Sequence, residues 1–97
     1  MIFLTKIKTD KILKALEKKG FKKDSKRDHI ILRFYMDNKK TAIFTKISHG
    51  KSEYGDPLLN YMKKELHISK PELINLINCV LSEEMYIEYL KQKGFFS

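Results

Sequence analysis

The segment His29–Met36 alternates in side-chain type, and this alternation limits the fold more than any other part of the sequence. Successive side chains of a β-strand point to opposite faces, so the pattern predicts a half-buried strand. Turn-forming residues 37–40 and the β-branched run Thr41–Ile47 follow, which predicts a hairpin. The expected inward set is Ile30, Leu32, Phe34 and Met36, and the outward set is His29, Ile31, Arg33 and Tyr35. In the second strand either Ile43 and Ile47 or Ala42 and Phe44 point inward.

Capping residues and apolar spacing predict a helix before this hairpin. Thr9 and Asp10 are good N-cap residues, and Gly20 is typical of a helix end, so the helix is expected over about 10–19. Residues 21–26 carry one large apolar side chain and many charges, which indicates a short strand near a sheet edge. After the hairpin, the polar, glycine-bearing stretch 48–55 is expected to form a surface loop.

The second half of the chain is predicted to be helical. Asp56 is a candidate N-cap before Pro57, Ser69 begins a capping-box pattern, and Ser82 begins a last helix that Gly94 closes. Cys79 lies between apolar positions of the third helix and is expected to be a small buried residue. The expected inner face of the second helix is Leu58, Leu59, Met62 and Leu66. Leu73, Leu76, Ile77 and Val80 follow at helical spacing in the third helix, and the last helix carries Met85, Tyr86, Tyr89 and Leu90.

This order of elements predicts an α+β two-layer sandwich. A helix, a three-stranded antiparallel meander, another helix and a two-helix tail place the helices on one face of the sheet and leave the other face free. The 97 residues fit one small domain, 1–97. The free face of the sheet is therefore the first place to look for a binding site.

Positive charge is concentrated in the first half of the sequence. The chain has 20 Lys and Arg against 12 Asp and Glu, for a net charge of +8. Residues 1–50 hold 14 basic against 5 acidic side chains, whereas residues 51–97 hold 6 against 7. This asymmetry favours an anionic partner for the first half, and the alternative is a solvated surface that keeps the protein soluble.

Several function classes lack their sequence signatures. No apolar run approaches the ~18 residues of a membrane-spanning helix, and 2–4 is too short for the core of a secretory signal. The single cysteine allows neither an intramolecular disulfide nor a cysteine pair for zinc. We find no phosphate-binding glycine loop, nucleophile elbow or acidic metal cluster. The expectation is a cytoplasmic protein without metal or other cofactor.

His29 is the strongest candidate for acid–base chemistry. It follows Lys26 and Arg27 and shares the predicted outward face with Arg33 and Tyr35. An imidazole exchanges a proton near neutral pH, and cations beside it would hold a phosphodiester, which suits RNA cleavage without a metal. The alternative is an inert, exposed histidine at a strand start. The further RNA-binding candidates are Lys22, Lys23, Lys26, Arg27, Arg33, Tyr35 and His49, of which His49 is equally well explained as a turn residue.

Short motifs in a defined order carry a family resemblance. Residues 16–21 read Leu-Glu-Lys-Lys-Gly-Phe, a basic stretch then leads to 28–29 (Asp-His), and a hairpin leads to 48–50 (Ser-His-Gly). Residues 55–59 read Gly-Asp-Pro-Leu-Leu, and 68–73 read Ile-Ser-Lys-Pro-Glu-Leu. Together they resemble the HicA toxin family over about three quarters of the chain, 8–80, and residues 82–94 extend beyond a typical member.

The resemblance implies a fold, an activity and a partner. HicA proteins are small basic ribonucleases of toxin–antitoxin systems with an α-β-β-β-α fold like that of double-stranded RNA-binding domains. The family histidine of a Gly-Ser-His motif matches His29, although 27–28 (Arg-Asp) stand where the family has Gly-Ser, and the family's loop histidine matches His49. An acidic HicB-like antitoxin is the implied partner.

Three hypotheses follow. The first is a HicA-like mRNA endoribonuclease that works without metal through His29. The second is a non-catalytic binder of structured RNA that uses shape and phosphate contacts. The third is a protein-interaction module whose basic half binds an acidic partner such as an antitoxin.

Overall fold

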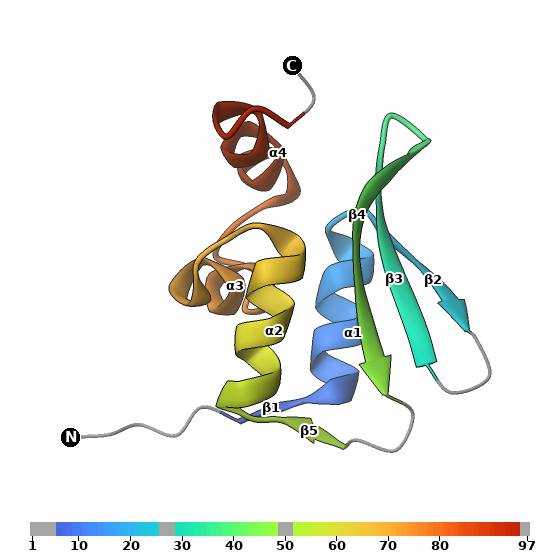
Figure 1. Cartoon of the computed structure of the whole chain (residues 1–97), viewed down its shortest axis with the longest axis vertical. Coiled ribbons are helices and arrows are strands. Elements are labelled where there is room, and N and C mark those ends of the chain that lie inside the picture. Colours follow the sequence, from blue (N-terminus) through green and yellow to red (C-terminus); the bar gives the residue numbers. More distant parts are fainter. Residues whose placement is uncertain (1–5, 26–28, 49–51, 96–97) are drawn as a thin grey trace.

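The computed structural model describes residues 6–25, 29–48 and 52–95. Four helices and a three-stranded antiparallel sheet make up most of this part, which confirms the α+β class (Figure 1). The strands are β1 (Ile7–Lys8), β2 (Phe21–Ser25), β3 (His29–Met36), β4 (Lys39–Ser48) and β5 (Glu53–Tyr54), and the helices are α1 (Thr9–Lys18), α2 (Asp56–Leu66), α3 (Lys70–Ile77) and α4 (Glu83–Gln92).

The sheet has the strand order β2-β3-β4, as predicted for a meander. A two-residue turn joins β3 to β4, and its residues Asp37 and Asn38 both have positive φ, 53° and 62°. Tight hairpins favour this conformation, and Asp and Asn tolerate it better than most side chains do. The inward residues of β4 are Ile43, Thr45 and Ile47, all buried. Phe44 and Lys46 therefore lie on the opposite face, which resolves the ambiguity of this strand.

The helices lie on one side of the sheet (Figure 1). Helix α1 packs against β2 and β3, and α2 packs against β4. The apolar stripe of α1 is fully buried at Ile12 and Leu16, and α2 contributes Leu59, Met62 and Leu66 to the same core. Gly20 ends α1 with φ +93°, and Phe21 directly after it is buried. The bounds predicted for the first helix, about 10–19, are thus right to within about one residue.

The C-terminal helices are anchored by caps and by one aromatic side chain. Ser69 and Glu72 form the predicted capping box of α3, and the Ser82 side chain accepts a hydrogen bond from the backbone N–H of Met85 in α4. Tyr86 of α4 is fully buried, and its ring packs edge-on against Phe34 of β3 at 5.2 Å between centroids. Helix α4 is therefore tied to the sheet through the core.

Two predictions for the end of α3 are wrong. The helix ends at Ile77, and Cys79 has a positive φ of 64° and is exposed rather than buried. Val80 is also exposed, with 67% of its surface accessible. The left-handed residue reverses the chain before Ser82, so the apolar spacing of α3 does not continue to position 80.

A short ladder between β1 and β5 was not predicted. Ile7 pairs with Tyr54 and Lys8 with Glu53. Because β1 leads into α1 and β5 leads into α2, this pairing holds the starts of the two helices near one another. Tyr54 is buried although the surrounding sequence is polar. The expected loop 48–55 therefore contains a strand.

Candidate nucleic-acid interface

The face of the sheet turned away from the helices, here called the outer face, carries most of the predicted site residues. Directly paired residues of an antiparallel ladder share a face. Leu32 and Phe34 of β3 are fully buried on the helical side, so the alternate residues lie on the outer face. The outer face consists of Lys22, Asp24, His29, Ile31, Arg33, Tyr35, Lys40, Phe44, Lys46 and Ser48.

The outer face is basic and aromatic together. Lys22, Arg33 and Phe44 form one row across the three strands. The Lys22 Nζ lies 4.4 Å from the centroid of the Tyr35 ring, and the Arg33 guanidinium carbon lies 4.9 Å from that of Phe44. Both distances are within the range of cation–π contacts. The rings thus hold the cations in place on an otherwise open surface.

A β-bulge fixes Arg33 in this row. The register between β3 and β4 shifts after Arg33, and Thr41 occupies the irregular position. Its hydroxyl donates to the Phe34 carbonyl at 2.6 Å, and its own carbonyl accepts from Arg33 Nη1 at 3.1 Å. Because the guanidinium has further N–H groups, it keeps donors available for a phosphate.

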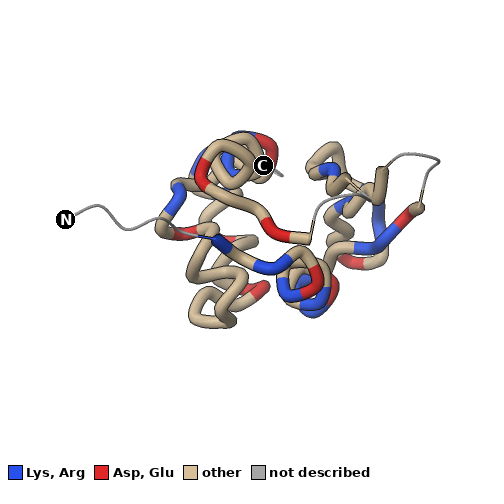
Figure 2. The backbone as a smooth tube through the Cα atoms, turned by 90° about the horizontal axis from the view of Figure 1, so that it is seen from below, with Lys and Arg blue, Asp and Glu red and all other residues tan. Residues whose placement is uncertain are grey.

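Lysine and arginine recur on the strands and on α1 (Figure 2). On the outer face, Lys22, Arg33, Tyr35 and Lys40 line a hollow that also has Asp24 at its border. Lys23 borders this hollow at the sheet edge, but its place opposite Leu32 turns its Cβ towards the helical side. Lys22 and Lys23 therefore line the same hollow, although their Cβ atoms leave the sheet on opposite sides.

His29 is exposed and lies at the end of the outer face, paired with Ser48. Arg33 is four residues further along β3, about 13 Å away at about 3.3 Å per residue. Lys22 is in the row of Arg33 and is equally remote. The row next to His29 holds Lys46, paired with Ile31. Lys46, which was not predicted as a site residue, is thus the outer-face cation closest to His29 in register.

Tyr54 supports the His29 end of the sheet and was also missed. Its hydroxyl donates to the Lys46 carbonyl and accepts from the Ser48 N–H, both at 3.3 Å. Burial raises the pKa of this phenol, although the hydrogen bond from Ser48 works in the other direction. The sequence signal was weak, since a lone tyrosine in a polar stretch also fits an exposed loop.

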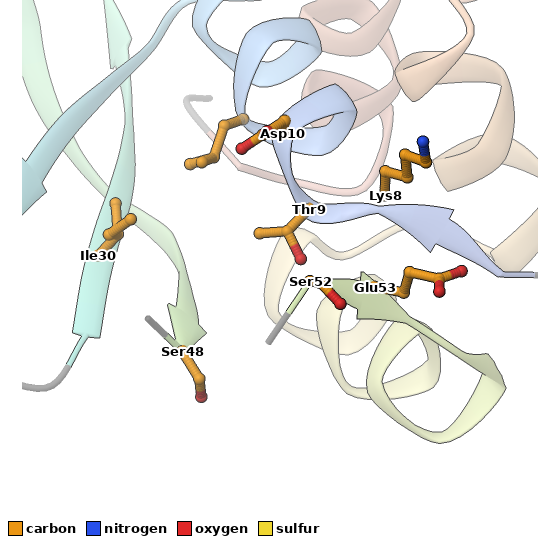
Figure 3. Close-up of a pocket in the computed structure, with 8 residues that line it drawn as sticks. Lys8, Thr9, Asp10, Ile30, Ser48, Ser52 and Glu53 are labelled. Atoms are coloured by element: carbon orange, nitrogen blue, oxygen red, sulfur yellow. The ribbon is translucent and has the colours of Figure 1, made fainter. Parts of the chain in front are cut away.

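A second hollow lies beside the same end of the sheet (Figure 3). Ile30 and Ser48 line it from the strands, and Thr9, Ser52 and Glu53 line it from the β1–β5 ladder and the start of α1. The Thr9 N–H donates to the Ser52 carbonyl at 2.9 Å, which holds the two segments together. The charged residues at this hollow are Lys8, Asp10 and Glu53, so it is not a basic site.

Some predicted site residues are not placed on this face. Lys26, Arg27 and His49 lie outside the described residues. Lys19, which belongs to the same basic stretch of sequence, is buried, and its Nζ donates to the Leu76 carbonyl near the end of α3 at 3.1 Å. A lysine at a helix C-terminus satisfies a free carbonyl. Lys19 is therefore a structural residue.

Metal sites and membrane spans are not found in the part of the chain that the structure describes. Residues 6–25, 29–48 and 52–95 contain no group of three or more His, Cys, Asp or Glu placed to hold a metal ion. Within the same ranges no helix has the length and apolar character to cross a membrane.

Comparisons with family models, with curated proteins and with solved structures give no match. The HicA likeness therefore rests on the order and spacing of the quoted residues.

Proposed function

We propose that this chain is a HicA-like toxin of a type II toxin–antitoxin system, an endoribonuclease that cleaves mRNA without a metal. The observation that carries the proposal is the outer face, where Lys22, Arg33, Lys40 and Lys46 accompany two aromatic rings and end at an exposed histidine. The order α1-β2-β3-β4-α2 is compatible with a double-stranded-RNA-binding-like core over 8–80.

The outer face suits RNA because it offers partners for both parts of a nucleotide. Ammonium and guanidinium groups bind phosphates, and their effect weakens with salt as counterions compete. The Tyr35 and Phe44 rings are partly exposed, and unstacked bases pack on such rings or on an arginine plane. A single strand laid along β3 would meet both kinds of group.

His29 supplies the proposed chemistry. As general base it takes the proton of a ribose 2′-hydroxyl while the 2′-oxygen attacks the adjacent phosphorus, and the bond to the 5′-oxygen of the next nucleotide breaks as water protonates that oxygen. As general acid it instead protonates that leaving oxygen. Lys46 is the outer-face cation placed to neutralise the additional negative charge on the phosphate.

A non-catalytic role for the same face is the second candidate. The observation that favours it is the separation of His29 from Lys22 and Arg33 by a full row of the sheet. In that case the outer face binds RNA, or an acidic HicB-like antitoxin, through charge alone. We propose the cytoplasm as the place of either activity, because mRNA and its toxins meet there.

Cleavage of a long transcript in EDTA tests the first candidate. The wild type should cut the RNA, and His29→Ala should lower the rate at least 100-fold, the range for loss of a general acid or base. His67→Asn is the matched control, because His67 lies at the end of α2 with φ 62°, a conformation that Asn tolerates. Equal persistence of the RNA with wild type and His29→Ala removes the catalytic claim, and salt-dependent binding without cleavage selects the second candidate.

A further inference from the structure

Helix α4 presents an apolar strip about a quarter turn away from its fully buried residues. Tyr86 and Leu90 are fully buried, whereas Met85 has 53% of its surface exposed. Met85 and Tyr89 are four residues apart and so lie on one face of the helix. With Leu81 just before the helix, they form the floor of a groove, here called the α4 groove.

The rim of the α4 groove is acidic. Helical spacing places Glu84 and Glu88 together on one flank of Met85, and Glu72 of α3 lines the groove as well. Partial burial acts to raise the pKa of Glu72, but hydrogen bonds from Ser69 and Tyr89 outweigh it and keep that pKa below its usual value. Three carboxylates thus surround a small apolar floor on a chain whose net charge is +8.

Lys93 lies near this groove and is already engaged. Lys93 Nζ donates to the His67 carbonyl at 2.7 Å and lies 4.5 Å from the centroid of the Tyr89 ring. This contact ties the end of α4 to the end of α2. The Glu84 and Glu88 side chains are exposed on the other flank of the strip and remain accessible to a ligand.

Charge decides what fits the α4 groove. RNA and an acidic antitoxin would meet like charges here, which costs binding energy. A second copy of this chain carries the same net charge of +8, so the two copies repel one another as wholes. A cationic helix with an apolar face would satisfy both the floor and the rim, and methionine adapts to many apolar partners.

We propose that the α4 groove is a docking site for a cationic amphipathic helix of a partner protein. Its apolar side chains pack on Leu81, Met85 and Tyr89, and its lysines or arginines pair with Glu84 and Glu88. Helix α4 lies on the helical side of the sheet, away from the outer face (Figure 1). The partner and RNA would therefore bind at the same time, and the docking site does not depend on the proposed nuclease activity.

The test is titration of a labelled synthetic peptide into the RNA-free protein, followed by fluorescence anisotropy. The peptide is about 18 residues long, with leucines on one helical face and lysines elsewhere, and a second peptide has glutamates in place of the lysines. Glu84→Lys/Glu88→Lys should weaken binding of the cationic peptide at least tenfold. Glu17→Lys/Glu53→Lys changes the net charge equally at exposed sites elsewhere and should leave binding within twofold.

Met85→Ala supplies the apolar arm of the same test. Because Met85 is largely exposed, the variant should fold normally and still lose at least threefold in affinity for the cationic peptide. Equal loss in both double variants, or equal binding of the glutamate peptide, overturns the proposal. Self-association in sedimentation that Glu84→Lys/Glu88→Lys abolishes also overturns it, since the groove would then hold a second copy.

Discussion

The outer face and the α4 groove are opposite in charge, yet both are supported by one cluster of aromatic rings. Phe34 of β3 lies between Arg33 and Tyr35 in sequence, and Tyr86 of α4 follows Met85. The rings of Phe21, Phe34 and Tyr86 lie with centroids 5.1 to 6.0 Å apart. Each surface thus belongs to a strand or helix whose inner residues meet in this cluster, and a small chain can carry two unlike surfaces because one core positions both.

Tyr86→Ala should have the largest effect, because it breaks the support common to both surfaces. The change removes a fully buried ring and the hydrogen bond from the Tyr86 hydroxyl to the Leu66 carbonyl at 2.8 Å. The expected loss is about 3–5 kcal/mol in the free energy of unfolding, measured by urea denaturation. Tyr61→Ala, at a position with 69% exposure on α2, should cost less than about 0.5 kcal/mol. If Tyr86→Ala loses peptide binding at the α4 groove but binds RNA as the wild type does, the two surfaces do not share this support.

Neutralising the outer face should weaken RNA binding without changing peptide binding at the α4 groove. Lys22→Gln/Arg33→Gln/Lys46→Gln should lower RNA affinity by roughly 100-fold near 0.15 M salt and reduce the salt slope by about 2 to 3. Binding of the cationic peptide at the α4 groove should not change. The matched control is Lys63→Gln/Lys64→Gln/Lys91→Gln, which removes three charges from α2 and α4. An equal loss in the control would mean that net charge, and not the outer face, binds RNA.

Gly20→Ala tests the point where α1, β3 and α4 approach one another. The φ of Gly20 is +93°, and an added Cβ would lie 2.7 Å from Glu83 Oε2 and 3.0 Å from Phe34 Cε1. We expect a loss of about 1–2 kcal/mol in unfolding free energy from strain in this left-handed conformation. Adding Glu83→Ala should restore only the part of the unfolding free energy that is lost through the contact between the new Cβ and the Glu83 side chain. Complete restoration would show that the backbone conformation costs nothing here.

Tyr54→Phe should have the smallest effect and should sharpen the distinction between the two ends of the outer face. Loss of the hydroxyl contacts to Lys46 and Ser48 should cost about 1 kcal/mol of stability. If the proposed nuclease is correct, cleavage should fall while RNA binding near Lys22 and Arg33 persists. Because the folded pKa of Tyr54 is raised above 10.0, its neutral form stabilises the fold below pH 10, and this contribution is lost as the pH rises further. Unfolding measured between pH 9 and 11 should therefore depend less on pH in Tyr54→Phe than in the wild type.

The sequence predicted the elements with regular patterns and missed those that depend on distant contacts. The alternation of 29–36 and the Ser69 capping box were local signals, and both are confirmed. The β1–β5 ladder pairs residues that are far apart in sequence, and its two strands are too short to show a period. The inner face of β4 was also undecidable locally, because apolar residues occupy both faces.

The sequence predicted which residues share a face of the sheet, but not which residues lie next to one another on that face. Alternation correctly grouped His29 with Arg33 and Tyr35. It could not show which residues of β4 lie beside His29, since the bulge at Thr41 sets that register. Lys46 and Tyr54 therefore emerged only with the structure. Cys79 is exposed instead of buried, and Lys19 is buried with its Nζ donating to the Leu76 carbonyl, a contact between residues far apart in sequence.

The two-residue turn at Asp37 and Asn38 has a consequence for the order of folding. A loop this short costs little chain entropy to close, so the β3–β4 hairpin is expected to form early. During synthesis the N-terminal part of a chain emerges first, so β3 and β4 leave the ribosome before α4. The strand register that aligns Arg33 with Phe44 can thus be established in a nascent chain that still lacks Tyr86. Packing of α4 against the sheet then stabilises this register.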